Sequence, residues 1–293
     1  TYALCLNPLY TQARESRAVL LELSQNYSEA LQEYDLVTSA VSKARGIQCL
    51  YRMGSYKDLK ERVQKLSLLP DPNIHVAAIS AFVSHQLKQK DPYPFCPNPL
   101  DFVWIGNLNK YKTDTEELIS GLIRDAQEQK LVWEPGGKTT KGGFQTADHI
   151  LEQQVEFETL KKFLRQEIGA YYDNFRTETC NFISLWPDSY SLNGWFVRLI
   201  KNGYQKSHIH PTGWLSGVVY LKTIDPLKNN EGAIELSLHG YDLPILDEAY
   251  PKKVHQPNVG DIVLFPSSLF HRTIPFTTDG ERCVIAFDLV PEI

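Results

Sequence analysis

A proline-rich segment divides this chain into two halves with different patterns. Residues 91–99 contain four prolines in nine positions. Proline lacks a backbone N–H and clashes with the preceding helical turn, so this segment cannot form the interior of a helix. Helical periodicity dominates before the segment, and short strand-like runs dominate after it. We therefore expect a helical domain over residues 1–95 and a strand-rich domain over residues 96–293.

The first half of the chain has the periodicity of amphipathic helices. Apolar residues recur at three- and four-residue steps between about residues 12 and 90, as they do on the buried face of a helix. One stripe runs through residues 27–41, and further helices are predicted over residues 47–53, 56–66 and 73–89. Gly46 and Gly54 bracket the helix over residues 47–53.

Two stretches of this half, residues 26–34 and 54–63, resemble the second helix of a tetratricopeptide repeat (TPR). Tyr27 and Tyr56 are 29 residues apart, whereas the repeat has a period of about 34. Leu59 stands where the repeat has a small residue. A repeat array and a small helical cap on the second domain are both compatible with the pattern. Either makes the helical region a candidate for binding a protein partner or for dimerisation.

The second half is rich in short strands. Its β-branched and aromatic runs are separated by Gly, Pro, Asn and Asp, which is typical of an antiparallel sandwich or barrel. The runs cover residues 101–105, 181–186, 195–200, 215–221, 233–238, 261–265 and 282–289. Helices are predicted over residues 116–127 and 149–172. A glycine-bounded loop at residues 136–143 is interpreted as lying near the mouth of a site, because it lacks the pattern of a nucleotide cradle.

Composition limits the class of protein. The chain has 293 residues, 42% of them apolar, which is enough for one large or two ordinary domains. A net charge of −5 disfavours a bulk nucleic-acid binder. Five cysteines without a Cys-x-x-Cys motif indicate reduced thiols in the cytoplasm, and neither a membrane-spanning run nor a basic leader is evident. We expect a cytoplasmic protein that binds neither nucleic acid nor membrane.

Two histidines one residue apart are the first candidates for chemistry. His208 and His210 lie between two strand-like runs, and residues i and i+2 of a strand point to the same side. Both imidazoles could then bind one metal ion, although such a pair alone is more often structural. His271 follows 61 residues after His210, which leaves room for about four strands. A barrel could bring the three together.

Arg282 opens an otherwise apolar strand. A buried guanidinium without an anionic partner is costly. Asp288 is the one acidic residue on the same face of that strand, six residues away. A bound carboxylate would instead satisfy Arg282 through a bidentate fork.

Taken in order, residues 207–220, residues 260–268, His271 and residues 282–287 resemble the iron(II)- and 2-oxoglutarate-dependent oxygenases, in a branch found in bacteria and phages. Residues 208–212 are also similar to the aspartyl/asparaginyl β-hydroxylases. The resemblance covers about residues 97–293. It implies a double-stranded β-helix (jelly-roll or cupin-like) domain with supporting helices, so the predicted fold class is α+β with an N-terminal TPR-like helical-hairpin region.

The resemblance also implies roles for individual residues. His208 and His271 would be iron ligands, and Arg282 would hold the distal carboxylate of 2-oxoglutarate. The third ligand of the family is usually a carboxylate, but this chain has His210 there. Either three imidazoles bind the iron, or His210 turns away and water completes the shell; we favour three imidazoles, whose neutral charge leaves more positive charge on the iron.

The cofactor-binding residues depart from the family pattern at one further position. Val284 stands where the family often has a hydroxyl side chain. The second contact to the 2-oxoglutarate carboxylate must then come from elsewhere, with Ser216 and Tyr220 as candidates. Gln205 and Arg198 are further candidates for cofactor binding.

The resemblance implies a dioxygenase that uses Fe(II), 2-oxoglutarate as co-substrate and O₂. It would hydroxylate a peptide or protein side chain, or an amino-acid-like small molecule, and release succinate and CO₂. The catalytic set would be His208, His210, His271 and Arg282. One alternative is a non-oxygenase metal-binding barrel of the cupin type, a sensor or isomerase, fused to a helical interaction module. Another is a helical scaffold with an inactive barrel, which the intact catalytic set argues against.

Overall fold

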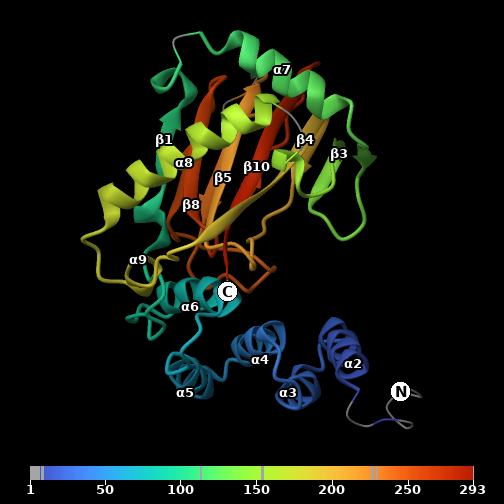
Figure 1. Ribbon diagram of the computed structural model, residues 1–293. Coiled ribbons are helices and arrows are strands. Elements are labelled where there is room, and N and C mark those ends of the chain that lie inside the picture. The colour runs from blue at the N-terminus through green and yellow to red at the C-terminus, as the bar shows by residue number, and fades with distance from the viewer. Residues whose placement is uncertain are drawn as a thin grey trace. The chain divides into compact units, whose positions relative to one another are not determined.

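The computed structural model describes residues 7, 10–112, 114–152, 155–225, 228 and 230–292. Two compact units are present, one of Thr1–Pro97 with Tyr241–Tyr250 and one of Asn98–Gly240 with Pro251–Ile293. The first is helical and the second combines helices with antiparallel sheet, as drawn in Figure 1. The α+β class is therefore confirmed. Cys5 and the rest of the first six residues, on which part of the localisation prediction depends, lie outside the described residues.

The helical unit consists of short helices that pack on their neighbours in the sequence. Its helices are α2 (Thr11–Leu23), α3 (Tyr27–Asp35), α4 (Ala40–Arg52), α5 (Tyr56–Leu66) and α6 (Ile74–Gln86). Helix α2 packs on α3, α3 on α4, and α4 on both α5 and α6. The side chains of Ser39 and Asn73 accept hydrogen bonds from the first turns of α4 and α6. These caps satisfy backbone N–H groups that have no partner inside the helix.

Two helix boundaries differ from the sequence prediction. The stripe over residues 27–41 spans two helices, because α3 ends at Asp35 and the Ser39 cap starts a new helix at Ala40. Gly46 does not precede a helix but lies within α4. A side chain at Gly46 would meet the guanidinium of Arg62 at 2.7 Å. The glycine therefore leaves room for the guanidinium of Arg62 from α5 and does not mark a helix start.

The helical unit also contains a segment from the second half of the sequence. Tyr51 donates a hydrogen bond of 2.8 Å to the carbonyl of Pro244. The amide oxygen of Gln86 accepts hydrogen bonds from the backbone N–H groups of Leu246 and Asp247, at 2.6 and 2.8 Å. Leu243 is buried. Residues 241–250 thus complete a unit whose other elements end before residue 98, which the sequence did not predict.

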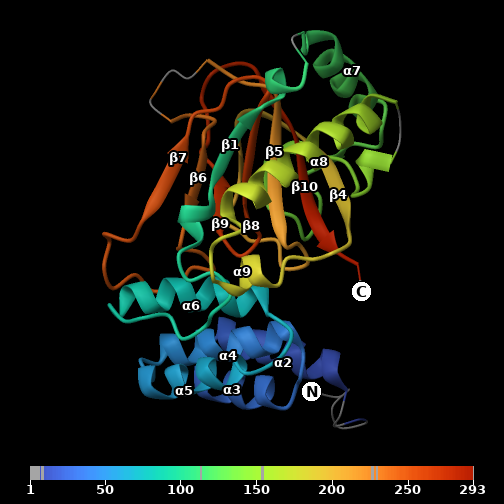
Figure 2. The same cartoon turned by 60° about the vertical axis from the view of Figure 1, so that its left-hand side comes forward.

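The second unit is built on two antiparallel sheets. The larger has the order β1-β8-β5-β10-β4-β3-β2 and the smaller the order β7-β6-β9. The strands are β1 (Trp104–Asn107), β2 (Val132–Trp133), β3 (Thr140–Gln145), β4 (Tyr190–Gln205), β5 (Leu215–Lys222), β6 (Ile234–Ser237), β7 (Lys252–His255), β8 (Asp261–Pro266), β9 (Phe270–Thr273) and β10 (Glu281–Pro291). Helix α8 (Val155–Phe175) crosses one face of the larger sheet (Figure 1), and the smaller sheet lies on the other side (Figure 2).

The central strand β10 determines which side chains meet inside this unit. It pairs with β4 on one edge and with β5 on the other. Alternation along β10 puts Arg282 and Asp288 on the same face. Asp288 lies opposite Ser216 of β5 and Asn193 of β4, and Arg282 lies opposite Leu199 of β4. This face of the larger sheet carries the candidate site.

Most predicted elements of the second half are present. Two predicted strands differ from the structure, and one predicted helix starts later than expected. The helix over residues 116–127 is α7 (Glu116–Gln127). Residues 181–186 form no strand: α9 (Asn181–Ser184) is a short helix, because a short apolar run fits a buried helix as well as a strand. The strand predicted at residue 101 starts only at Trp104, after the 3-10 helix Pro99–Phe102.

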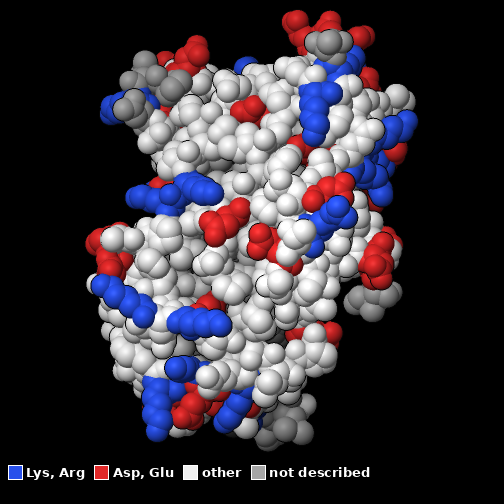
Figure 3. Space-filling view, turned by 90° about the vertical axis from the view of Figure 1, so that its left-hand side faces the viewer, with Lys and Arg blue, Asp and Glu red and all other residues white. Residues whose placement is uncertain are grey.

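The helix predicted over residues 149–172 starts later. His149 has a φ of 78°, which is incompatible with a right-handed helix, and the described part of α8 begins at Val155. Residues 153 and 154 of that prediction lie outside the described part of the chain. None of the described helices is long and apolar enough to cross a membrane. The face drawn in Figure 3 mixes cationic and anionic side chains.

We expect Gly217→Ala to lower the free energy of unfolding of this unit by about 1–3 kcal/mol, because it overpacks the core. A Cβ atom there would collide with the buried ring of Phe287 and lie 2.8 Å from Leu264. Urea denaturation of both variants measures the change. Gly169→Ala, at an exposed position of α8 with nothing within 4 Å, is the matched control and should not destabilise. Equal stability of the two variants would contradict the packing described here.

Candidate metal centre

Backbone pairing brings three histidines together. His208 and His210 lie in the segment between β4 and β5, and His271 lies in β9. His208 and His271 exchange two backbone hydrogen bonds, of 3.1 and 3.0 Å, as an isolated antiparallel bridge. The N–H of His210 donates to the carbonyl of Ser267 at 3.1 Å. These bonds anchor the motif to the segment that carries His271.

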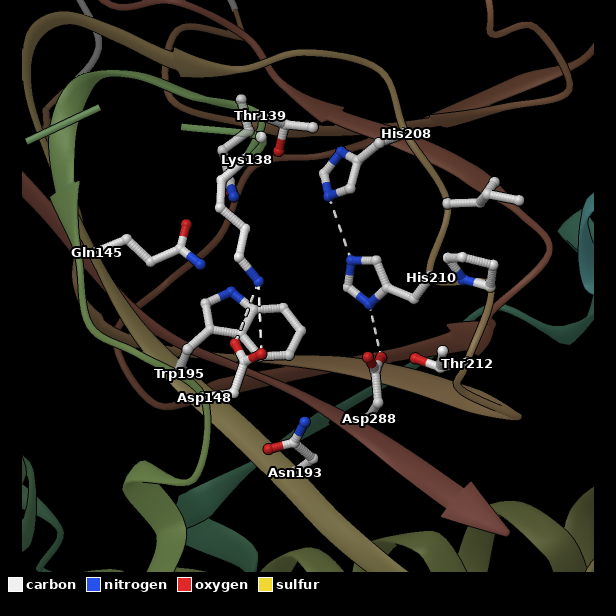
Figure 4. Close-up of a pocket in the computed structure, with 14 residues that line it drawn as sticks. Lys138, Thr139, Gln145, Asp148, Asn193, Trp195, His208, His210, Thr212 and Asp288 are labelled. Atoms are coloured by element: carbon white, nitrogen blue, oxygen red, sulfur yellow. Dashed lines mark hydrogen bonds and ion pairs between the residues drawn. The ribbon is translucent and has the colours of Figure 1, made fainter. Parts of the chain in front are cut away.

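The three side chains converge on one point. Each offers a ring nitrogen, and these nitrogens lie within 4.8 Å of one another. The Nε2 atoms of His208 and His210 are 3.2 Å apart, as the dashed line in Figure 4 marks. Two nitrogens that bind one ion at about 2.1 Å and at right angles would be about 3 Å apart. The spacing suits neighbouring ligands of a single metal ion.

The hydrogen bonds of the Nδ1 atoms fix which nitrogen of each ring is free to bind a metal. Nδ1 of His208 donates to the Lys206 carbonyl at 2.7 Å, and Nδ1 of His271 donates to the Leu269 carbonyl at 3.2 Å. Nδ1 of His210 donates to the carboxylate of Asp288 at 2.6 Å. With Nδ1 protonated in a neutral ring, Nε2 carries a lone pair.

Burial keeps the rings of His208 and His271 neutral. Burial, with a smaller contribution from His210, lowers the pKa of His208 to about 3. Burial and the neighbouring histidines also hold the pKa of His271 well below its ordinary value. The Nε2 atom of His208 therefore carries a lone pair, and it faces Nε2 of His210 across 3.2 Å. A metal ion can bind at both nitrogens when each presents a lone pair.

A cleft of about 280 Å³ opens beside His208 and His210. Figure 4 shows that its wall on the side of β3 and β4 is mostly polar. Its lining residues are Gly137, Lys138, Thr139, Gln145, Asp148, Asn193, Trp195, Gln205, His208, Ile209, His210, Pro211, Thr212 and Asp288. The glycine-bounded loop therefore reaches the site, as predicted, through residues 137–139.

Arg282 is buried away from this cleft and is incompletely paired. Its exposed fraction is 2%, and its Nε donates to the Gly232 carbonyl at 3.0 Å. Its guanidinium carbon lies 4.9 Å from the ring centroid of Tyr220. Among the described residues, neither Nη1 of Arg282 nor the Tyr220 hydroxyl has a hydrogen-bond partner. Two buried donors without an acceptor fit the carboxylate of a bound 2-oxoglutarate.

The remaining predicted site residues lie in three different environments. Gln205 lines the cleft. Ser216 is fully buried, and its hydroxyl donates to Asp288 at 2.7 Å, so it supports the histidine cluster instead of reaching towards Arg282. The prediction that Arg198 lines the pocket is wrong. Strand alternation turns Arg198 to the opposite face of β4, where its guanidinium carbon lies 4.6 Å from the ring centroid of Phe144.

Sequence reasoning misses several residues around the cluster. It treats Asp288 only as a partner for Arg282, but the Asp288 carboxylate bonds His210 instead. Lys138, Gln145 and Asp148 come from a loop and strand far upstream of the histidines. Only the glycine-bounded loop signals that this region approaches the site.

The comparisons with known proteins agree with this chemistry. Residues 193–288 match the family model described as "Putative 2OG-Fe(II) oxygenase". The matched segment contains all three histidines and Arg282. The segment belongs to the 2OG-Fe(II) oxygenase family. The name of this family points to chemistry that uses Fe(II) and 2-oxoglutarate, and the three clustered histidines of the matched segment could hold the iron.

A search of solved structures found matches that include the following three. A prolyl-4-hydroxylase from Pseudomonas putida is 14% identical, with 65% of this chain and 92% of that chain covered and a TM-score of 0.49. HygX from Streptomyces hygroscopicus, with nickel and 2-oxoglutarate bound, is 15% identical, with 65% and 83% covered and a TM-score of 0.47.

The third is a prolyl hydroxylase from Trichoplax adhaerens in complex with a hypoxia inducible factor peptide fragment. It is 13% identical, with 78% of this chain and 91% of that chain covered and a TM-score of 0.46. A search of curated protein sequences found no match. The similarity to aspartyl/asparaginyl β-hydroxylases stays a prediction.

We expect His271→Ala to weaken Co(II) or Fe(II) binding at least 100-fold, because it removes one of three converging ligands. Titration of the metal-free protein, followed by visible spectroscopy for Co(II), measures the change. His255→Ala is the control: His255 is also bonded to a carboxylate, that of Asp261 at 3.0 Å, but lies outside the cluster. Metal binding by His271→Ala at the wild-type level would exclude this centre.

Proposed function

We propose that the oxygenase binds Fe(II) through Nε2 of His208, His210 and His271. Arg282, with Tyr220 beside it, receives the distal carboxylate of 2-oxoglutarate. The enzyme hydroxylates a side chain of a peptide or protein substrate and releases succinate and CO₂. The main support for this proposal is the convergence of three imidazole nitrogens within 4.8 Å of one another, with the Nε2 atoms of His208 and His210 3.2 Å apart.

The residues of the chain have separable tasks in this mechanism. Bound Fe(II) and 2-oxoglutarate supply the oxidising chemistry with O₂. Three protein ligands leave three of six positions of an octahedral ion open, as this chemistry requires. The rings of Trp195 and Phe265 lie 5.3 Å from His210 and 4.6 Å from His271, respectively, between centroids, and pack against these two imidazoles.

Arg282 distinguishes this proposal from its main alternative. A cupin-type sensor or isomerase also needs a metal site, but it has no need of a buried, incompletely paired guanidinium. Leaving such a group without an acceptor costs on the order of 1–3 kcal/mol. A co-substrate carboxylate removes that cost and so explains why the arginine is kept. The orphaned Nη1 therefore favours the oxygenase.

We also propose a more specific fold for each unit and a cellular location for the protein. We assign the two facing antiparallel sheets to a double-stranded β-helix. We also assign the helical unit to a TPR-like module that binds a protein partner or dimerises, since α3 and α5 coincide with the two stretches that resemble the repeat. Burial raises the pKa of the Cys49 and Cys283 thiols to about 12 and about 11, which makes them unreactive. This accords with a cytoplasmic location.

Anaerobic addition of Fe(II) and 2-oxoglutarate tests the proposed function. We expect a weak visible charge-transfer band that is absent in His271→Ala. Arg282→Met should raise the 2-oxoglutarate concentration for half-maximal absorbance about 10- to 100-fold, because a charged hydrogen bond is lost. Arg198→Met, on the same strand pair but the opposite face, is the matched control and should bind as wild type. A missing band, together with no succinate in air, would reject the proposal.

The cleft supports a neutral amide as the group recognised next to the metal. Gln205 Nε2 donates to the Thr140 hydroxyl at 3.5 Å, and that hydroxyl donates to Gln145 Oε1 at 2.9 Å. Thr140 is fully buried and Gln145 is 3% exposed. The relay turns Gln145 Nε2 towards the cleft as a donor (Figure 4) and leaves Gln205 Oε1 as an acceptor. A peptide group, with one acceptor and one donor, matches that pair.

The charges of the cleft agree with an uncharged substrate group. Lys138 and Asp148 both line it, and Lys138 Nζ lies 3.3 Å from Asp148 Oδ1. The pair is neutral as a whole, so neither charge is left to select an ionic substrate. Lys138 Nζ also lies 5.9 Å from the centroid of Trp195, which forms an apolar wall. We therefore favour a peptide over a free amino acid.

Pools of capped, uncharged peptides incubated with Fe(II), 2-oxoglutarate and O₂ test the substrate class. We expect peptides that gain one oxygen by mass spectrometry. Gln145→Glu should raise the peptide concentration for half-maximal rate about 10-fold or more, because the donor is lost, whereas half-saturation by the co-substrate should not change. Gln127→Glu, at an exposed site on α7, is the control. Turnover of free amino acids but not of capped peptides would overturn the assignment.

A further inference from the structure

The proposed iron site lacks a charge that this kind of centre normally has. Two histidines and one carboxylate place one negative charge on the metal, whereas three neutral imidazoles place none. A bare dication among neutral ligands is held less tightly and is harder to oxidise. The chain should therefore carry a compensating charge close to the ligands.

Asp288 carries such a charge directly behind His210. Its Oδ1 accepts from His210 Nδ1 at 2.6 Å, and its exposed fraction is 5%. Among the described residues, His210 is its only ion-pair partner. No Lys or Arg of the described chain reaches this carboxylate. A buried carboxylate without a cation is costly, so its positive partner must come through His210.

A buried hydroxyl network fixes this carboxylate. Ser216 Oγ donates to Asp288 at 2.7 Å and lies 2.8 Å from Ser267 Oγ. Both serines are fully buried. A Cβ atom at Gly213 would lie 2.7 Å from Ser267 Oγ and 3.0 Å from Asp288 Cγ, so only glycine lets the backbone close over the network.

Asp288, Ser216 and Ser267 therefore form a hydrogen-bonded support for the imidazole of His210. The carboxylate lies on β10, and the serines come from β5 and from the turn after β8. Carboxylates that accept from the far nitrogen of a ligating histidine orient the ring and make it a stronger base. His210 would then act as a ligand with partial negative charge.

We propose that Asp288 is a positioning residue that supplies, through His210, the negative charge that a carboxylate ligand would place on the metal directly. The acid is displaced from the position of the third ligand to a strand 78 residues downstream. This inference rests on the proposed function, because it requires that the three histidines bind the metal.

The first test removes the charge and keeps the shape. Asp288→Asn should weaken Co(II) binding about 10- to 100-fold, the usual effect of losing such a partner. The visible spectrum of the Co(II) protein should also change, and the Fe(III)/Fe(II) potential should rise. A merely structural role would leave the spectrum and the potential as in the wild type. Asp261→Asn, which disrupts the His255 pair outside the cluster, is the matched control and should leave all three readouts unchanged.

The second test exchanges the positions of the charge. His210→Asp alone places two carboxylates in one buried site, where like charges repel. The double variant His210→Asp/Asp288→Asn has a single carboxylate, now on the metal. We expect the double variant to bind Co(II) at least 10-fold more tightly than His210→Asp, although each single change weakens binding. Additive losses would overturn the inference.

The outcomes separate this inference from the proposed function. If His271→Ala retains metal, the centre itself is wrong. If His271→Ala loses metal while Asp288→Asn matches the wild type in affinity, spectrum and potential, the centre stands and the role of Asp288 is rejected. Circular dichroism and the unfolding midpoint identify any variant that fails to fold. The double variant then decides the question, because its Co(II) affinity is compared with that of His210→Asp and not with that of the wild type.

Discussion

The two backbone hydrogen bonds between His208 and His271 are the interaction on which the site depends. They close the chain between β4 and β5 onto β9, so that both imidazoles leave the backbone at one place. Backbone carbonyls then hold the Nδ1 atoms of these same two rings. Main-chain groups thus determine both where these two rings lie and which nitrogen of each ring carries the proton. Such a site needs few additional side chains to orient its ligands.

Strand β10 links the two ends of the chemistry. Its inward face presents Asp288 to the histidine cluster at one end and Arg282 at the other. Between them lie small and apolar side chains, Val284 and Ala286, which keep the interior free of competing charge. One rigid strand, paired on both edges, therefore sets the separation between metal and anion site. A loop could not hold that separation as constant.

Much of this arrangement is readable from the sequence, for identifiable reasons. Strand periodicity locates β5, β8 and β10, and the His-x-His spacing predicts a shared direction for His208 and His210. Two errors come from information that the local pattern lacks. The side of β4 on which Arg198 lies depends on register with neighbouring strands. The hydrogen-bond partner of Asp288 is the imidazole of His210, which lies in the segment between β4 and β5 and is not visible in the local pattern around Asp288. The strand prediction for residues 181–186 is wrong because a short apolar run fits strand and helix alike.

Residues 241–250 belong to the N-terminal unit although they are synthesised late, and this affects how that unit folds. The helices that precede residue 98 leave the ribosome long before Pro244 and Leu246, to which Tyr51 and Gln86 hydrogen-bond, have been synthesised. During that interval the early helices lack part of their final packing surface. The N-terminal unit can therefore reach its native state only after most of the sheet-forming chain has emerged. Assembly of the two units is coupled in time, although their folds are distinct.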